Sequence, residues 1–538
     1  MTLSAPRSHF GTHEVGNQPP TRGDCDLWQD DIALREAISR EGGQAESLAA
    51  YGKAMGSARM RQAGQDANRH SPELVLFDQG GRRLDEVHFH PAWHELMQTS
   101  LGAGYAGIAW DRTGGGHVTH AAMVYLASQT EPGHCCPMTM TYAAFPALAA
   151  NPALAAIWQP RLSARDYDPS TRPVSEKSAA TLGMAMTEKQ GGSDLRSNAT
   201  TAISEGDHYR LRGHKWFCSA PMSDGFLTLA QAPGGLTCFL VPRWLEGERN
   251  AIHIQRLKDK LGNRSNASAE IEYHDAIAYR LGDEGAGVRT IIEMVHHTRL
   301  DTALAPAGLM RGALSVAKHW VNHRSAFQKR LIDQPLMQAV MADLALDCEG
   351  TLALGMRVAR AFDSTDPKDR AFARIGVALA KFLGNKRCPI VTYEAMEALG
   401  GMGYIEETGQ PLYYREAPLN GIWEGSGNVI CLDILRTLAK EPLAAEALRT
   451  ELDAATGSDR RYDAALKDHA ERWPGLPPEG EARWFAERTA LLLTASVLIR
   501  AGVSVVSDAY VTTRIAGERG HITGAISAPV SPELLKRI

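Results

Sequence analysis

The sequence predicts a mainly α-helical protein with one small antiparallel β-domain between two helical domains, followed by a further helical segment. Three observations indicate this fold class. Apolar residues recur at helical spacing up to about residue 180, short alternating segments replace that pattern between about residues 183 and 285, and helical spacing then returns. Because 538 residues exceed what one core usually holds, we expect about three or four domains. The divisions fall at 1–180, 181–286, 287–440 and 441–538.

The N-terminal domain is expected to be helical behind a loose polar arm. Apolar residues have helical spacing around Ala121–Leu126 and Tyr142–Ile157, and a turn-rich stretch at 166–173 marks the boundary. Residues 1–20 contain no apolar core flanked by a cleavage site, so we expect no secretory signal. The longest apolar run, Ala490–Ile499, is about half of what a bilayer needs. We therefore expect a cytoplasmic protein with no membrane contact.

The β-domain is predicted from five short segments whose apolar residues alternate. Gly234–Gly235 lies between two of them as a hairpin turn. The segments are His208–Arg212, Leu227–Gln231, Leu236–Val241, Ile252–Arg256 and Ala269–Tyr273.

Long helices packed as a bundle are expected after residue 287. One apolar face is marked by Leu309, Ala313, Val316, Ala317 and Trp320, and another by Met337, Val340, Met341, Leu344, Cys348 and Leu352. The pattern stops near residue 441. The remaining segment is predicted to be helical, with a break at 474–480 and a Gly- and Pro-rich tail.

Charge and cysteine content exclude some classes of function. The net charge of −5 gives no overall attraction to nucleic acid or to an anionic membrane. Residues 441–538 hold 12 Lys and Arg against 14 Asp and Glu, although from residue 500 onward the count is 5 against 3. A solvated helix face is the alternative interpretation of these charges. The eight cysteines lack metal-ligand spacing, so we expect reduced, mostly buried thiols and no metal site.

The loop of residues 421–429, here called the base loop, sets Glu424 beside Trp423 between glycines. A carboxylate held in an apolar pocket can take a proton from carbon. The alternative is an ordinary helix N-terminus, with Glu424 near the positive end of the dipole and Ser426 or Asn428 as the cap.

Two further motifs lie in the β-domain. In residues 187–194, here called the glycine loop, Gly191 and Gly192 permit close approach to a ligand, and Ser193 could bind a pyrophosphate. An ordinary turn is the alternative, and the loop lacks the strand–helix context of a dinucleotide-binding unit. On a strand, Phe217 and Ser219 share a face and could offer a flat apolar wall and a hydroxyl to a planar ligand. A core aromatic strand is the alternative.

With these motifs the chain resembles the acyl-CoA dehydrogenase family. The glycine loop resembles the family's flavin loop, residues 216–219 its flavin-facing strand, residues 324–327 its Arg-x-x-Phe, residues 400–404 its Gly-Gly-x-Gly-Tyr turn, and residues 422–425 its catalytic-base loop. The motifs occur in the family's order over about residues 80–440. The resemblance implies the family's α–β–α-bundle fold, FAD as cofactor, and a homotetramer.

The resemblance also implies roles for single residues. Glu424 stands at the position of the base that removes the α-proton of an acyl-CoA while hydride leaves for flavin N5. FAD contacts are implied for Met184, Thr187, Gly191, Gly192, Ser193, Phe217, Ser219, Arg324, Phe327, Trp423, Ser426 and Asn428. Substrate contacts are implied for Thr187, Ser193, Arg299, Gly401 and Tyr404. In this sequence Phe217 replaces a usual Trp, Ser219 a Thr, and Gln328 a Gly.

One branch of the family, flavoproteins of the adaptive response to alkylation damage, is more similar in residues 187–194, 256–266 and 422–428 and after residue 440. This resemblance implies slow α,β-dehydrogenation of an acyl-CoA, with a branched, isovaleryl-type chain as one candidate. The alternative that it implies is a protective flavoprotein that binds double-stranded DNA. For Arg299, a helix-surface charge or a buried ion-pair partner is the alternative to a ligand contact.

Overall fold

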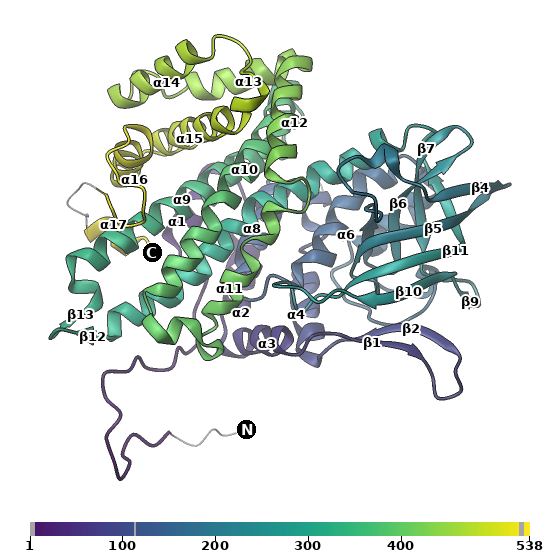
Figure 1. The fold of residues 1–538 in the computed structure, drawn as a ribbon, viewed down its shortest axis with the longest axis horizontal. Coiled ribbons are helices and arrows are strands. Elements are labelled where there is room, and N and C mark those ends of the chain that lie inside the picture. The colour runs from purple at the N-terminus through teal and green to yellow at the C-terminus, as the bar shows by residue number, and fades with distance from the viewer. Residues whose placement is uncertain (1–5, 112–113, 527–531) are drawn as a thin grey trace.

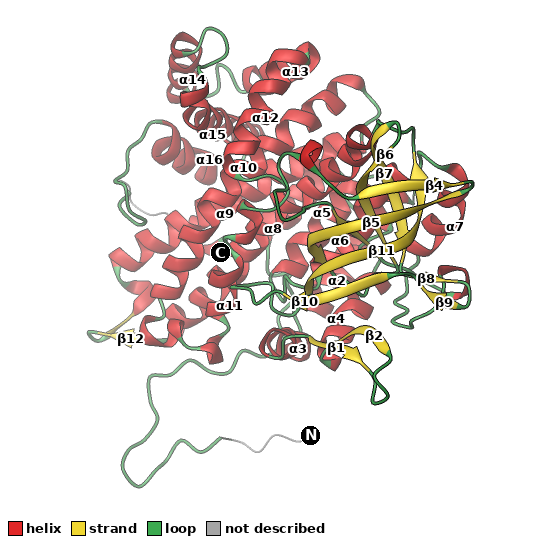
Figure 2. Cartoon of the chain, turned by 45° about the vertical axis from the view of Figure 1, so that its right-hand side comes forward, coloured by secondary structure: helices red, strands yellow, loops and turns green. Residues whose placement is uncertain are grey.

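The computed structural model describes residues 6–111, 114–526 and 532–538. A helical domain, a β-sheet, a bundle of long helices and a further group of helices follow one another along the chain (Figure 1). Figure 2 shows the sheet on one side of the helical body. This architecture confirms the predicted fold class.

The first helices form a compact layer behind the extended N-terminal arm. They are α1 (Ile32–Glu41), α2 (Ala45–Met55), α3 (Ala58–Arg69), α4 (Pro91–Gly102), α5 (Gly116–Ser128), α6 (Cys135–Leu148) and α7 (Pro152–Leu162). Every residue of α5 is buried, because the helix is nearly apolar all round and other helices surround it. The single helical stretch expected over 142–157 is divided, since Asn151 accepts a hydrogen bond from Leu154 N and starts α7.

A hairpin that the sequence analysis did not identify interrupts the helices of this mostly helical region. Strands β1 (Glu73–Phe77) and β2 (Arg83–His88) pair antiparallel. The turn between them forms because the Asp78 carboxylate accepts hydrogen bonds from Gly80 N and Arg82 N.

The β-domain is one seven-stranded sheet. Its strands are β3 (Leu182–Ala185), β4 (Thr201–Glu205), β5 (His208–Ser219), β6 (Gly225–Ala232), β7 (Gly235–Pro242), β10 (Ile252–Leu257) and β11 (Ser268–Leu281). The short strands β8 (Trp244–Leu245) and β9 (Glu248–Arg249) pair beside it. Pairing is antiparallel, except that β6 runs parallel to β3 and β4. Ala232 pairs with Gly235 across the β6–β7 turn, so the predicted hairpin is confirmed.

The bundle consists of α8 (Gly287–His323), α9 (Pro335–Asp363), α10 (Pro367–Glu397), α11 (Gln410–Glu416) and α12 (Gly427–Lys440). The two predicted apolar faces meet, since Leu309 and Ala313 of α8 lie in the same buried cluster as Met341 and Leu344 of α9. A two-stranded hairpin, β12 (Ser325–Ala326) and β13 (Lys329–Arg330), follows α8.

The C-terminal segment packs on α9, α10 and α12 (Figure 1). Its helices are α13 (Pro442–Asp453), α14 (Arg460–Arg472), α15 (Ala482–Ala501), α16 (Ser504–Tyr510) and α17 (Pro532–Lys536). The apolar run 490–499 lies in α15, and most of it is buried. Among the described residues no helix is long and apolar enough to cross a membrane. Part of the predicted tail, 527–531, lies outside the described residues.

Candidate functional site

Glu424 lies in the turn that precedes α12, and α8 holds it from one side. Its Oε2 accepts a hydrogen bond from the Thr298 hydroxyl at 2.6 Å, and its backbone oxygen accepts one from Arg299 Nε at 3.2 Å. Its φ of 56° is left-handed, which is uncommon for a residue with a Cβ. An uncommon backbone conformation that neighbouring groups hold in place is frequent at functional sites.

The surroundings keep the Glu424 carboxylate basic. Burial raises the pKa of Glu424 above its ordinary value, while the Thr298 hydrogen bond and the charges of Lys381 and Arg299 oppose that rise. Ser426 is the N-cap residue of α12, but within the described residues its side chain caps no N–H group. The loop does lead into the N-terminus of α12, but the Glu424 carboxylate is bound by Thr298 of α8 and does not cap that helix.

Arg299 is buried and binds two partners. Its Nη1 lies 2.7 Å from Asp433 Oδ2, and its Nε donates to the Glu424 carbonyl. Arg374 binds the same Asp433 at 2.8 Å. The alternative of a buried ion-pair partner therefore describes Arg299, and the same side chain also fixes the base loop.

The predicted aromatic wall lies on β5. Phe217 keeps 47% of its surface exposed, and Ser219 Oγ lies 3.4 Å from Ser268 Oγ. Lys258 Nζ lies 4.8 Å from the centre of the Phe217 ring. An exposed ring is not a core residue, so the core-strand alternative does not describe Phe217.

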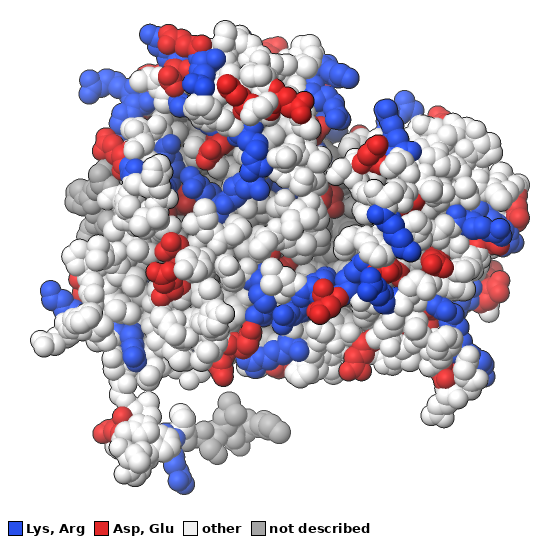
Figure 3. Space-filling model, in the orientation of Figure 1, with Lys and Arg blue, Asp and Glu red and all other residues white. Residues whose placement is uncertain are grey.

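Cys136 of α6 is buried, and groups of both the wall and the base loop influence its thiol. Burial raises the pKa of the Cys136 thiol to about 12, Lys260 and Ser219 oppose that rise, and Glu424 adds to it. Figure 3 shows the surface hollowed where the sheet meets the bundle.

The glycine loop is anchored to β5. The Thr187 carbonyl accepts from Trp216 N at 2.7 Å, and a Cβ on Gly192 would collide with Thr187 Oγ1. Gly191 has a φ of 150° and open space beside it, so a ligand can approach its backbone. Met184 precedes the loop on β3, and Ser193 is exposed within it.

A buried ion pair that sequence reasoning missed holds this loop. Glu188 Oε1 lies 2.8 Å from Lys215 Nζ, and both side chains are fully buried. Burial alone would raise the pKa of Glu188, but Lys215 and the donors of Thr200 and Ala199 lower it to about 2. The sequence did hold one indication of this pair, since Lys215 stands at an inward-facing position of a strand, where a buried charge needs a partner.

The remaining predicted residues lie on other parts of the bundle. Phe327 has a φ of 52° at the tip of the β12–β13 hairpin and is 93% exposed. Arg324 Nη1 donates to the Asn17 carbonyl at 2.6 Å. Figure 1 shows this hairpin at the end of the molecule opposite the sheet. Gly401 and Tyr404 lie in a short 3-10 helix after α10, where Tyr404 is 82% exposed.

The structure adds two contacts to the base loop that the sequence analysis missed. The Trp423 indole N–H donates to Asn420 Oδ1 at 2.7 Å. Arg483 of α15 donates to Asn428 Oδ1 at 2.9 Å, so the C-terminal segment touches the loop. Neither contact has a signal in the sequence, because the partners meet only after folding.

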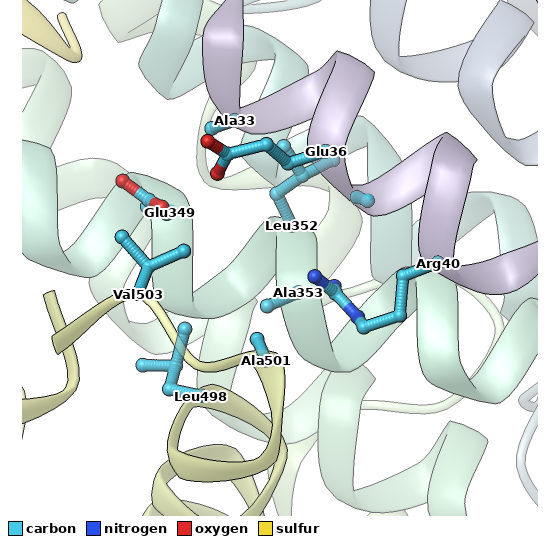
Figure 4. Close-up of a pocket in the computed structure, with 10 residues that line it drawn as sticks. Ala33, Glu36, Arg40, Glu349, Leu352, Ala353, Leu498, Ala501 and Val503 are labelled. Atoms are coloured by element: carbon cyan, nitrogen blue, oxygen red, sulfur yellow. The ribbon is translucent and has the colours of Figure 1, made fainter.

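A small cavity lies elsewhere, between α1, α9 and α15 (Figure 4). Its volume of about 10 Å³ is at the lower limit of what holds one water molecule. Glu36, Arg40 and Glu349 line it together with apolar residues. None of the predicted site residues lines it, so it is not the candidate ligand site.

The residues present fit the flavin that the resemblance implies. The exposed Phe217 ring offers a flat apolar surface, Ser219 a hydroxyl, and Gly191 an accessible backbone. The N-terminus of α12, with Ser426 and Gly427, has the partial positive charge that suits a diphosphate.

Comparisons with known proteins give the family of the chain. Three family models match: Adaptive response protein AidB N-terminal domain over residues 17–169, Acyl-CoA dehydrogenase, middle domain over 183–276, and Acyl-CoA dehydrogenase, C-terminal domain over 285–439. The chain is 47% identical to "Putative acyl-CoA dehydrogenase AidB" of Escherichia coli (strain K12), over 85% of this chain and 86% of that protein.

Two similarities concern Caenorhabditis elegans. The chain is 31% identical to "Acyl-CoA dehydrogenase family member 11", over 89% of this chain and 78% of that protein. The crystal structure of ACDH-11 in complex with C11-CoA has a TM-score of 0.84 at 28% identity and covers 98% of this chain and 96% of that chain.

Proposed function

Because the chain belongs to the acyl-CoA dehydrogenase family and groups with its AidB-like members, we propose that Glu424 is the base of an FAD-dependent α,β-dehydrogenation of an acyl-CoA. One observation carries this proposal. Glu424 is a carboxylate with a raised pKa, in a left-handed backbone conformation, and a hydrogen bond from Thr298 orients it.

The chain's own residues handle the proton. Thr298 occupies Oε2 of Glu424, so we assign Oε1 to accept the α-proton of the thioester. The raised pKa makes the carboxylate a stronger base and lets it hold that proton. Bound FAD supplies the acceptor for the β-hydrogen, which leaves as hydride.

Residues from three regions would hold the cofactor. We assign the planar flavin ring of FAD to Phe217 and Trp423, with Met184 and Ser219 beside it. The diphosphate is assigned to the glycine loop (Thr187, Gly191, Gly192, Ser193) and to Ser426 and Asn428 at the start of α12. Open backbone at Gly191 and the helix dipole of α12 support these assignments.

Arg324 and Phe327 belong to the segment of the β12–β13 hairpin, which lies at the opposite end of the molecule from the sheet (Figure 1). We therefore propose that the hairpin serves the adenine half of FAD in a neighbouring subunit of a homotetramer. The 93% exposed Phe327 ring supports an intersubunit contact.

The proposed substrate is an acyl-CoA. A structural neighbour is a complex with C11-CoA, which supports the class but not a chain length. We assign Thr187, Ser193, Gly401 and Tyr404 to the substrate entrance, and Arg299 to holding the base loop beside it. Preference for a branched, isovaleryl-type chain and location in the cytoplasm stay predictions.

The test is anaerobic mixing of the purified yellow protein with a panel of acyl-CoA thioesters. We expect bleaching of the flavin absorbance with at least one thioester. Glu424→Gln is expected to keep the flavin and abolish bleaching, while Glu407→Gln, an exposed carboxylate, behaves as the wild type. A colourless protein without flavin would contradict both the cofactor and the mechanism.

Binding of double-stranded DNA, and a role in the alkylation response, stay predictions of the branch resemblance. The C-terminal arginines that raised the local charge in the sequence form ion pairs: Arg500 with Glu451, Arg514 and Arg519 with Asp343, and Arg537 with Glu36 and Glu349. Duplex binding that weakens steeply with salt is expected from this hypothesis. Absence of binding at low salt would contradict it.

A further inference from the structure

Lys381 of α10 is a buried cation that the mechanism above does not use. Only 2% of its surface is exposed. Its Nζ donates to two backbone carbonyls, Asn420 O at 3.0 Å and Gly425 O at 2.8 Å. A buried ammonium loses the solvation of water, and two carbonyls replace it only in part. Its position therefore costs free energy that an apolar side chain there would not.

The two carbonyls lie on either side of Glu424, that of Asn420 directly before the base loop and that of Gly425 within it. Fixing them to one Nζ sets the distance across the turn in which Glu424 has its φ of 56°. Such a conformation costs roughly 1–3 kcal/mol and persists where the surroundings over-determine it. Arg299 adds a third bond, to the Glu424 carbonyl itself.

Lys381 and Arg299 differ in how their charges are balanced. Arg299 is paired with Asp433 at 2.7 Å. The charged groups near Lys381 are the Glu424 carboxylate, Arg299 and Lys386. Burial and the two cations lower the pKa of Lys381 to about 7, and Glu424 opposes that shift. Lys381 also helps to keep the pKa of Glu424 from rising further. In its protonated form, which prevails below about pH 7, Lys381 therefore favours the ionised carboxylate of Glu424.

We propose that Lys381 is a positioning residue for proton abstraction, which holds the base loop through the Asn420 and Gly425 carbonyls and favours the ionised form of Glu424. The inference rests on the proposed role of Glu424 as the base. It assigns to α10 a part in catalysis without contact with substrate.

The test uses the holoenzyme of Lys381→Met and, as a matched control, Lys368→Met. Lys368 lies on the same helix with an exposed side chain that pairs with Glu446. Flavin absorbance, the rate of anaerobic bleaching at several pH values and acyl-CoA concentrations, and amide hydrogen exchange of residues 420–427 are measured. Lys381→Met is expected to retain flavin and to bleach at least ~10-fold more slowly, with less than about threefold change in half-saturating acyl-CoA.

The bleaching rate falls at low pH as Glu424 is protonated, and this fall is here called the acid limb. In Lys381→Met the acid limb is expected to move to higher pH, because loss of the cation disfavours the ionised carboxylate. Amide hydrogen exchange of residues 420–427 is expected to be faster in Lys381→Met than in the wild type. Lys368→Met is expected to match the wild type in rate, pH profile and exchange. Lys381→Arg keeps the charge but not the donor geometry, so it should bleach slowly with an unshifted acid limb. If Lys381→Met does not fold, the bleaching rate of Lys381→Arg is the test of the inference. A wild-type bleaching rate in Lys381→Arg would overturn it.

Wild-type rate, pH profile and exchange in Lys381→Met would overturn the proposal. Failure of the proposed function has a different signature, since Glu424→Gln would then still bleach, or no acyl-CoA would bleach the wild type. In that last case the exchange measurement still decides whether Lys381 holds the loop.

Discussion

At the scale of single residues, Glu424 shows how an ordinary side chain acquires a specific role. Its carboxylate has one hydroxyl partner, Thr298, and two nearby cations, and its backbone has a conformation that most residues avoid. Burial raises its pKa while these partners limit the rise. The balance gives a base stronger than a free glutamate, whose ionised form is favoured by the Thr298 hydroxyl and the two cations.

Replacement of Thr298 with Val removes the hydrogen bond to the carboxylate but nearly keeps the shape of the side chain. Because that bond favours the ionised form, its loss raises the pKa of Glu424 further. The base must be ionised, so the acid limb of the bleaching rate should move to higher pH. A hydrogen bond to a charged group stabilises by about 1.5–3 kcal/mol, so loss of this bond is expected to move the profile measurably.

The measurement is the anaerobic bleaching rate between pH 5 and 9. Thr290→Val is the matched control, since Thr290 lies on the same helix and bonds to its own helix backbone. An acid limb shifted equally in both variants, or in neither, would contradict the role of Thr298.

At the scale of elements, the glycine loop depends on a buried charge pair more than on its glycines. Glu188 accepts hydrogen bonds from Lys215 of β5 and from the Ala199 and Thr200 backbone. The pair joins the loop, the start of β4 and the middle of β5. A turn so anchored can present open backbone at Gly191 without losing its shape.

Glu188→Gln is expected to lower the free energy of unfolding by about 3–5 kcal/mol, because it leaves the Lys215 ammonium buried without its counter-charge. Urea unfolding measures this change. Asp275→Asn, which breaks the exposed Arg212–Asp275 pair on the same sheet, is the control and should cost at most about 1 kcal/mol.

The same pair predicts a pH dependence. The pKa of Glu188 is lowered from 4.5 to about 2 in the folded protein. Its contribution to stability is therefore full above pH 4.5 and is lost as the pH falls toward 2. The difference between wild type and Glu188→Gln should shrink over that window, and a constant difference would contradict the assignment.

The β12–β13 hairpin should act in cofactor binding although it lies far from the sheet. Arg324→Ala is expected to weaken FAD binding by about 10- to 100-fold, the range that loss of one charge-assisted contact gives. Titration of the apoprotein with FAD measures it. Arg330→Ala on the same hairpin, where Arg330 pairs with Asp333, should bind FAD as the wild type does. Equal affinities for all three proteins would contradict a role for the hairpin.

At the scale of the whole molecule, the C-terminal segment is part of the main core. Ala486 and Leu493 of α15 belong to the same buried cluster as Phe372 and Leu379 of α10. The segment also reaches the base loop through Arg483. It is therefore integrated with the bundle and is not an appended module.

A variant that ends at residue 440 is accordingly expected to lose solubility or to melt at a much lower temperature, since it exposes apolar faces of α9, α10 and α12. Calorimetry of the full chain and the truncated chain measures this. Removal of residues 1–15 is the control and should change the melting temperature by only a few degrees, since the described part of this segment, 6–15, is exposed. A stable 1–440 protein would contradict integration of the segment.

Much of the architecture follows from local pattern. Helical spacing at Leu309 and Ala313 and alternation around Leu227 identified α8 and β6 because each periodicity buries one face. The β1–β2 hairpin was missed, since its strands are short and lie between helices. At the site, the roles assigned to Glu424 and Phe217 came from resemblance of motifs, and the structure shows surroundings consistent with them.

By itself the sequence determined the order of the domains, the family, the cofactor class and the carboxylate that carries the proposed chemistry. Only the tertiary structure decided that Thr298 and Lys381 face Glu424, that Glu188 and Lys215 hold the glycine loop, and that Arg483 reaches Asn428. The physical reason is separation along the chain. Periodicity and turn chemistry act between near neighbours, whereas burial, charge pairing and pKa depend on residues that meet only when the long helices and the sheet pack together.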